Sequence, residues 1–475
     1  MASKVKTIFA NMSWLMFSQV LTSVLAFIWT ILTAQYLGPS DYGIFGSAVS
    51  ISTIFGVFAT FGIFTYLVRA ISTDFENEDK YVNNTLSLKL FLAIFYFAII
   101  IVSLLVLGWN RYVIGICLLF AFEYLIKTFH DVFFSSFQAH EKIKYQAITN
   151  IILNVLTLVF IVLVIVTDFG LIGIAFAYIF ANIAGLIYAV YAMRKHIMKP
   201  KFTFDFSFYK VLIKAGIPFA LTGLFYTIYY SIDIVMITQF ASTYDTGLYN
   251  AAYNLISVLA LFYSIYSAVV FPVMSKLFTN EKDLLHLSFI KSIKYLSLVT
   301  IPIAVFTSFY GGDIIAIYGP KFVEAGDVLA ILIWTVCFLF INGACSLILN
   351  SSHEEYSVTK IYSIAAVFNV ILNLILIPKY SVYGASVATV LSEILILILE
   401  LYMIRKIGQL PDRHLIFDIL KIVIASVVMG LVLYYFHLNL WIAIVVSVIV
   451  YFALVILLRV ADQDDKLIIK QIMGK

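Results

Sequence analysis

The chain is dominated by long apolar runs that contain almost no charge and are separated by short polar segments. An α-helix needs about 20 predominantly apolar residues to cross the hydrocarbon core of a bilayer. Of the 475 residues, 63% are hydrophobic and only 12% are charged, which leaves too little polar surface for a soluble protein. The runs therefore predict an all-α polytopic membrane protein. They exclude a soluble enzyme, a disordered chain and a nucleic-acid binder, and their continuity excludes an outer-membrane barrel, whose strands alternate in polarity.

The apolar runs predict about fourteen membrane helices joined mostly by short connections, so that neighbouring helices are antiparallel. The first run extends from about Phe9 to Thr33, which is too long for the apolar region of a signal peptide, and it is predicted to be the first membrane helix. The expected spans are 9–35, 43–69, 86–109, 112–137, 146–167, 171–193, 211–238, 247–275, 288–310, 325–349, 358–377, 382–404, 415–436 and 440–459.

The positions of the basic residues predict the orientation of these helices. Lys and Arg concentrate in the cytoplasmic loops of membrane proteins. If the N-terminus is cytoplasmic, 26 of the 30 basic residues lie at cytoplasmic helix ends, whereas Arg111, Lys321 and Lys379 lie outside and Lys127 lies within a helix. This distribution predicts an even number of helices with both termini in the cytoplasm.

An internal repeat divides the chain. Residues 35–45 read QYLGPSDYGIF and residues 239–249 read QFASTYDTGLY, so that Gln, Asp and Gly coincide at an offset of 204. Three further matches follow in the same order, at offsets of 211 to 213: His140-Glu141 with His353-Glu354, Gly173 and Ala177 with Gly384 and Ala388, and Arg194-Lys195 with Arg405-Lys406. The matches indicate duplication of a six-helix unit, and parallel repeats of this kind place the substrate site between them.

The repeat predicts the domain organisation. We expect an N-lobe at 1–200 with helices 1–6, a C-lobe at 201–406 with helices 7–12, helices 13 and 14 at 407–460, and a cytoplasmic tail at 461–475. Polar stripes recur on corresponding helices: Ser18 aligns with Thr222, and Ser50 aligns with Asn254. Such stripes either form hydrogen bonds between helices or face a wet cavity. We favour a central cavity shared by the two lobes.

Helix 4 carries the densest set of ionisable side chains in the apolar spans. Glu123, Lys127, His130 and Asp131 are spaced i, i+4, i+7 and i+8, which places them on one stripe of a helix. Ionisable residues within a membrane span are costly and require a reason. The stripe is either a structural salt bridge or a charged wall that contacts an anionic head group, and nothing in the second half duplicates it.

Four other polar residues are predicted to belong to the site. Arg69, at the cytoplasmic end of helix 2, is either an anchor at the membrane surface or a phosphate ligand. Asp233 lies on the polar stripe of helix 7, Asn254 on that of helix 8, and Glu393 in the middle of helix 12. Glu400, further along helix 12, is interpreted as an interfacial residue.

Several of these segments resemble one protein family. Residues 35–50, QYLGPSDYGIFGSAVS, are similar to the junction of helices 1 and 2 in polysaccharide flippases, the O-antigen-unit and lipid-linked oligosaccharide translocases of the multidrug/oligosaccharidyl-lipid/polysaccharide exporter superfamily. The segments 61–69, 137–141 and 318–325 resemble the same family, and the resemblance covers the whole chain. It implies two six-helix lobes around a cavity that opens alternately to each side of the membrane.

The resemblance also implies the function. The expected activity is transfer of a polyprenyl-pyrophosphate-linked oligosaccharide from the cytoplasmic to the outer leaflet of the plasma membrane. The expected partners are this polyprenyl-linked glycan and membrane lipid, with glycan-assembly enzymes as further candidates; the chain is expected to be a monomer that binds no nucleic acid.

The alternatives are a multidrug or organic-cation antiporter of the sister branch and a non-transporting membrane scaffold. Helix 1 lacks the carboxylate and the proline that the antiporter branch shows there. We expect no enzyme activity, cofactor or metal, and the three cysteines, Cys117, Cys337 and Cys345, are predicted to be buried small hydrophobes.

Overall fold

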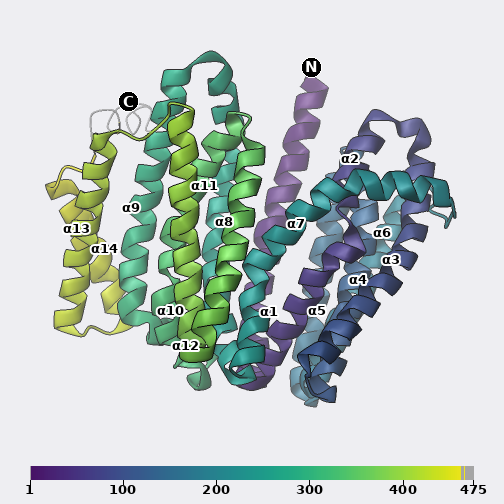
Figure 1. The fold of residues 1–475 in the computed structure, drawn as a ribbon, viewed down its shortest axis with the longest axis horizontal. Helices are drawn as coiled ribbons and strands as arrows, with labels where there is room; N and C mark the ends of the chain where they lie inside the picture. Colours follow the sequence, from purple (N-terminus) through teal and green to yellow (C-terminus); the bar gives the residue numbers. More distant parts are fainter. Residues whose placement is uncertain (1, 462–464, 466–475) are drawn as a thin grey trace. The chain divides into compact units, whose positions relative to one another are not determined.

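The computed structural model describes residues 2–461 and residue 465, without the side chains of residues 2–10, 12 and 280. Most of the predicted tail, 461–475, therefore lies outside the described residues. All regular elements in the described part are helical, as Figure 1 shows, which confirms the predicted all-α polytopic fold. The elements are α1 (Ala2–Thr60), α2 (Ile63–Thr73), η1 (Phe75–Asn77), α3 (Glu78–Leu107), α4 (Arg111–Ala139), α5 (Ile143–Thr167), α6 (Gly170–His196), α7 (Phe206–Phe240), α8 (Thr243–Asn280), α9 (Lys282–Ile315), η2 (Ala316–Tyr318), η3 (Pro320–Phe322), α10 (Ala325–Leu332), α11 (Trp334–Ser351), α12 (Glu355–Lys406), α13 (Arg413–Phe436) and α14 (Leu440–Leu457).

Twelve helices in the described part are long and apolar enough to cross a membrane. Two of them contain a break where the sequence predicts the end of one span and the start of another. In α1, Gly38 has φ 71° and ψ 174°, and the following Pro39 has no N–H to donate. In α12, Ser381 has φ 48° and ψ −131°, three residues after Pro378. Division at these breaks gives fourteen segments close to the predicted spans, and the number and direction of membrane crossings stay predictions.

One predicted span differs from the structure. The span 43–69 is interrupted at Phe61 and Gly62, where both residues have positive φ. The cause is the close approach of α7. A Cβ on Gly62 would lie 2.6 Å from the Cβ of Phe219, and a Cβ on Gly216 would lie 2.1 Å from the carbonyl oxygen of Phe61. The backbones of the two segments can approach this closely only because both positions are glycine.

The repeat is visible in the backbone conformation as well as in the sequence. The break between α5 and α6 has Gly170 at φ 62°, and the break inside α12 has Ser381 at φ 48°, at the offset of 211 that relates the two halves. The turn after α4 contains Glu141 at φ 55°, and the turn after α11 contains His353 at φ 63°. Left-handed residues are uncommon outside glycine, so their recurrence in corresponding turns supports the duplication.

The chain forms two compact units, Met1–Asn250 and Ala251–Lys475. In the first unit, α7 packs against α1 and α2. The core of this unit lies where α2, α3, α4 and α6 meet α7, and it includes Leu67, Phe133, Met193 and Leu212. The lobe boundaries at 200 and 406 stay predictions.

The two copies of the repeated motif touch each other within the first unit. A Cβ on Gly43 would lie 1.8 Å from the carbonyl oxygen of Thr243, and a Cβ on Gly247 would lie 1.9 Å from the carbonyl oxygen of Pro39. Gly247 is the repeat counterpart of Gly43, and Thr243 is the counterpart of Pro39, because both pairs are 204 residues apart. The contact is therefore reciprocal.

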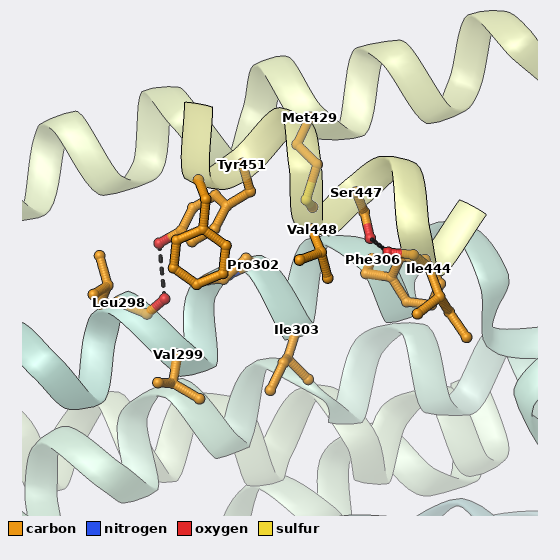
Figure 2. A pocket seen from close by; sticks show the side chains of 11 residues that line it. Leu298, Val299, Pro302, Ile303, Phe306, Met429, Ile444, Ser447, Val448 and Tyr451 are labelled. Carbon is orange, nitrogen blue, oxygen red and sulfur yellow. Dashed lines mark hydrogen bonds between the residues drawn. The ribbon is translucent and has the colours of Figure 1, made fainter. Parts of the chain in front are cut away.

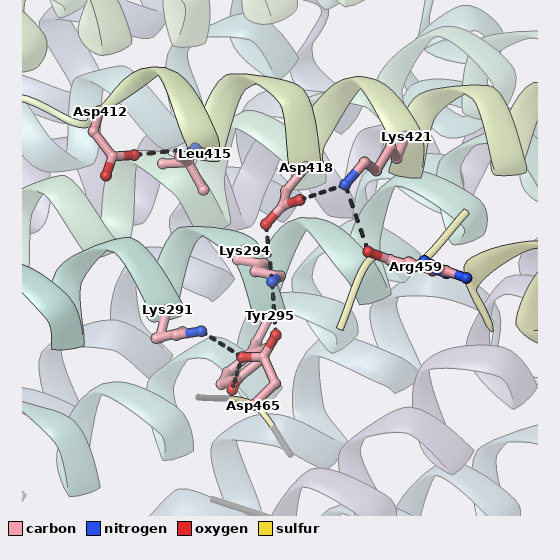
Figure 3. A network of polar contacts seen from close by, with 9 residues as sticks. All are labelled: Lys291, Lys294, Tyr295, Asp412, Leu415, Asp418, Lys421, Arg459 and Asp465. Carbon is pink, nitrogen blue, oxygen red and sulfur yellow. Dashed lines mark hydrogen bonds and ion pairs between the residues drawn. The ribbon is translucent and has the colours of Figure 1, made fainter. Parts of the chain in front are cut away.

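In the second unit, α9 packs against α10, α11 and α13. A buried ion network holds one end of α9, as Figure 3 shows. The Nζ atoms of Lys291 and Lys294 lie 2.6 Å from the two carboxylate oxygens of Asp465, and Lys294 also lies 2.9 Å from Asp418 of α13. The hydroxyl of Tyr295 donates to Asp465 at 2.7 Å. The two lysines thus join α9 to α13 and to the segment that follows α14.

Candidate functional site

A polar cavity of about 460 Å³ lies inside the first unit. It contains the whole predicted stripe of α4, so the i, i+4, i+7, i+8 spacing correctly placed four side chains on one wall. The opposite walls come from α1, α5 and α6. The polar lining residues are Ser52, Thr53, Glu123, Tyr124, Lys127, His130, Asp131, Asn150, Asn154, Thr157, Tyr178 and Asn182.

Glu123 is the best-connected group of this wall. Its side chain is buried, and its Oε1 atom lies 2.8 Å from the Nζ atom of Lys127. The same oxygen accepts a hydrogen bond of 2.8 Å from Nδ2 of Asn182 on α6, and the Nε2 atom of His130 lies 3.1 Å from the backbone oxygen of Asn182. Two contacts thus fix α4 against α6. Since a buried carboxyl group requires polar partners, the contacts with Lys127 and Asn182 stabilise Glu123 in this position.

Lys127 is the cation that the cavity exposes. Its side chain is 47% exposed, whereas that of Glu123 is 6% exposed. Asp131 follows one turn later and interacts electrostatically with Lys127 and with Lys89, a buried residue of α3. The formal charges of these four side chains cancel. The exposed ammonium group is therefore available to a ligand, while its negative partners are held inside the wall.

Two residues of this arrangement were not predicted from the sequence. Lys89 counted as a cytoplasmic basic residue at the start of helix 3, but its side chain is buried and its Nζ atom donates to the carbonyl oxygen of Ala59 at 3.4 Å. Asn182 lies inside the predicted span 171–193, and nothing in the sequence indicates its contact with Glu123. Lys89 is three residues inside the predicted span 86–109, and a lysine near the end of a span carries no signal in the sequence of the residues that it contacts in the fold.

The other four predicted site residues lie outside this cavity. Arg69 is exposed near the end of α2, and Asn254 is partly exposed on α8. Asp233 is buried on α7, where its Oδ2 atom accepts a hydrogen bond of 2.8 Å from the hydroxyl of Tyr249. Glu393 is buried in the second unit. A central cavity that joins all eight residues stays a prediction.

The second unit contains a contact of the same kind as Glu123–Asn182, between an amide and a carboxyl group on neighbouring helices. Asn342 of α11 donates to Oε2 of Glu393 on α12 at 2.7 Å, and both side chains are buried. In the repeat, α11 corresponds to α4, and Glu393 corresponds to Asn182 at the offset of 211. At this one corresponding position the first half has an amide and the second half a carboxyl group, whereas Asn342 is 219 residues from Glu123 and lies outside the offsets that relate the halves.

An apolar groove of about 320 Å³ lies among α9, α13 and α14 (Figure 2). Its lining includes Pro302, Phe306 and Val448. The two hydroxyl groups on its wall bond to the backbone: Ser447 donates to the carbonyl oxygen of Ile444 at 2.8 Å, and Tyr451 donates to that of Leu298 at 2.7 Å. The groove therefore presents hydrocarbon rather than free polar groups.

The long apolar helices and the polar cavity enclosed by α1, α4, α5 and α6 define a multi-pass α-helical membrane protein. Residues 8–278 match the family described as polysaccharide biosynthesis protein, and the chain belongs to this family. A relative in Methanocaldococcus jannaschii, named as an uncharacterized membrane protein, is 25% identical over 84% of each chain. A relative in Haloferax volcanii, named probable low-salt glycan biosynthesis flippase Agl15, is 23% identical over 76% of this chain and 75% of that protein.

Solved structures share the fold. The lipid II flippase MurJ in an inward closed conformation has a TM-score of 0.75 at 19% identity, covering 95% of this chain and 99% of that one. An inward-facing multidrug resistance transporter of the MATE family has a TM-score of 0.66 at 13% identity, covering 81% of this chain and 94% of that one. Flippases and drug transporters therefore both have this architecture, and the fold alone does not distinguish their cargoes.

Proposed function

We propose that this protein is a flippase that moves a polyprenyl-pyrophosphate-linked oligosaccharide from the cytoplasmic to the outer leaflet of the plasma membrane by alternating access. The observation that carries the proposal is the cavity wall of α4, where Lys127 is exposed and its carboxylate partner is buried. The family and the named flippase relative support the same function.

The cargo has three chemically different parts, and the described residues offer a surface for each. The ammonium group of Lys127 is suited to a pyrophosphate oxygen, which it binds as a compact point charge. The amides of Asn150 and Asn154 line the same cavity and can exchange hydrogen bonds with sugar hydroxyls. The apolar groove of the second unit is suited to an isoprenoid chain, which gains free energy from burial away from polar groups. Binding of the pyrophosphate, the sugars and the isoprenoid chain makes or breaks no covalent bond, and we propose no enzyme activity.

The test is translocation in proteoliposomes that contain a fluorescent, short-chain isoprenyl diphosphate oligosaccharide in both leaflets. An impermeant quencher added outside reaches only the outer leaflet unless the protein exchanges the two pools. Wild-type protein should make the whole pool accessible. Equal quenching in liposomes with and without the protein would overturn the proposal.

A multidrug or organic-cation antiporter is the second candidate, because a MATE transporter shares the fold. The first segment of α1, from Ser13 to Gly38, contains no Asp or Glu that would attract a cation. The same liposomes loaded with a fluorescent organic cation separate the two functions. Cation efflux without glycan-lipid translocation would favour the antiporter.

A further inference from the structure

Glu400 has a buried carboxyl group in which only one of the two oxygens has a hydrogen-bond partner among the described residues. It lies on the second half of α12, and its side chain is 0% exposed, which replaces the sequence-based interpretation of an interfacial residue. Its Oε1 atom accepts a hydrogen bond of 2.6 Å from the hydroxyl of Ser346 on α11. Its Oε2 atom is buried and has no hydrogen-bond partner among the described residues.

Among the described residues, the groups that interact with Glu400 provide no positive charge. The titratable neighbours that interact with it electrostatically are Tyr263 on α8, Cys345 on α11, Tyr362 on the first half of α12, and Glu393 seven residues earlier on the same helix. Tyrosine and cysteine are neutral in their ordinary state, and a second carboxyl group disfavours ionisation. The salt bridges found in the described part of the chain include none to Glu400.

The first unit shows a buried carboxyl group that has both a cation and an amide donor beside it. Glu123 has the ammonium group of Lys127 at 2.8 Å and an amide donor at the same distance. Within the described part of the chain, Glu400 has one hydroxyl donor and no ion pair. Its repeat counterpart at the offset of 211 is Ala189, which is also buried, so the helix packing itself does not require a carboxyl group at this position.

We propose that Glu400 is a proton-binding site of the second unit, which holds its proton in this conformation and releases it when α11 and the second half of α12 separate. An isolated charge in a buried position is so unfavourable that the group neutralises instead. Ionisation therefore requires water at Oε2, and the proton passes to that water. Because the two protonation states favour different packings of α11 against α12, proton binding and conformation are linked.

Two hydrogen bonds join α11 to the second half of α12, and both lie near Glu400, so that its protonation acts on this interface. Asn342 and Ser346 are one turn apart on α11, while their partners Glu393 and Glu400 are two turns apart on α12. All four side chains therefore lie along one interface. A charge on Glu400 would admit water beside both contacts at once.

Infrared difference spectroscopy in lipid tests the protonation directly. Glu400→Gln keeps an oxygen that accepts from Ser346 and removes the titratable group. The matched control is Glu355→Gln, at the exposed start of α12. At neutral pH, wild type minus Glu400→Gln should show the carbonyl stretch of a protonated carboxyl group, shifted in deuterium oxide, and wild type minus control should not. Absence of this band from the first difference would overturn the proposal.

The link to transport rests on the proposed flippase function and is tested separately. Liposomes with an internal pH dye should report proton movement that accompanies glycan-lipid translocation by wild type and the control, but not by Glu400→Gln. Proton movement that persists in Glu400→Gln, or a requirement for Na⁺ instead of protons, would refute the coupling. If wild type fails to translocate the glycan lipid while the infrared band is present, the flippase function fails and the proton site stands.

Discussion

Gly43 and Gly247 are repeat counterparts, and each packs against the backbone of the other motif. Their hypothetical Cβ atoms would lie 1.8 Å from Thr243 and 1.9 Å from Pro39, residues that are counterparts themselves. Self-complementary contact is the property of a twofold interface between identical subunits. Here two copies of one motif within a single chain have the same property.

The first prediction concerns this glycine pair. Gly43→Ala should destabilise the protein by about 1–3 kcal/mol, because the added methyl group meets backbone rather than a flexible side chain. Thermal unfolding in detergent measures the effect. The control is Gly115→Ala on α4, where a Cβ has nothing within 4 Å. Equal unfolding temperatures for the two variants would show that the glycine contact is not tightly packed.

The second prediction separates the structural role of Lys127 from its cargo-binding role. The double variant Lys127→Gln with Glu123→Gln should remain folded, because it leaves no unpaired charge from this ion pair. Its translocation rate at limiting cargo should fall about 10- to 100-fold, since a hydrogen bond to a charged group contributes about 1.5–3 kcal/mol. Lys127→Arg should retain activity, and Lys360→Gln, at an exposed position of α12, is the control for a lost surface charge. Normal transport by the double variant would make the pair purely structural.

The third prediction concerns Arg69. This side chain is exposed and makes no ion pair within the described part of the chain, so Arg69→Ala should not reduce the amount of folded protein. If Arg69 binds the cargo phosphates, glycan lipid accumulates in the inner leaflet of cells that carry the variant. Leaflet-specific labelling measures this, with Arg194→Ala at the exposed end of α6 as control. Full glycan export by Arg69→Ala would reduce Arg69 to a membrane-surface anchor.

The fourth prediction concerns the network in Figure 3. Lys294 is buried between Asp418 and Asp465, so Lys294→Ala leaves both carboxylates with fewer positive partners. Loss of one partner from a buried ion pair costs about 3–5 kcal/mol, and the unfolding temperature should fall accordingly. Lys282→Ala, at the exposed start of the same helix, should have little effect. A stable Lys294→Ala variant would contradict a structural role for the network.

The fifth prediction is the topology. The three cysteines are buried in the described structure, so a cysteine-free background should fold and accept single probes. A probe between residues 194 and 210 should react only after an impermeant reagent gains access to the cytoplasm, whereas a probe next to Lys379 should react from outside. External labelling in 194–210 would reverse the orientation.

The sequence was most informative where a single helix decides the outcome. Apolar length predicted the helices, and the spacing of Glu123, Lys127, His130 and Asp131 predicted a common wall, because both are properties of one helix. The sequence was least informative where the contact between two helices determines the local structure. The break at Phe61 and Gly62 depends on the approach of α7, and the burial of Glu400 depends on α11. Hydropathy indicates how deep in the membrane a residue of a helix lies, but it does not indicate which helix packs against each face.

The two buried hydrogen bonds between an amide and a carboxyl group, Glu123 with Asn182 and Asn342 with Glu393, have one corresponding position, because Asn182 and Glu393 are 211 residues apart. The first half has its carboxyl group on α4, next to the ammonium group of Lys127. The second half has Glu393 and Glu400 on α12, and the ion pairs of the described part include none to Glu400. Two halves with the same order of helices therefore differ in electrical character.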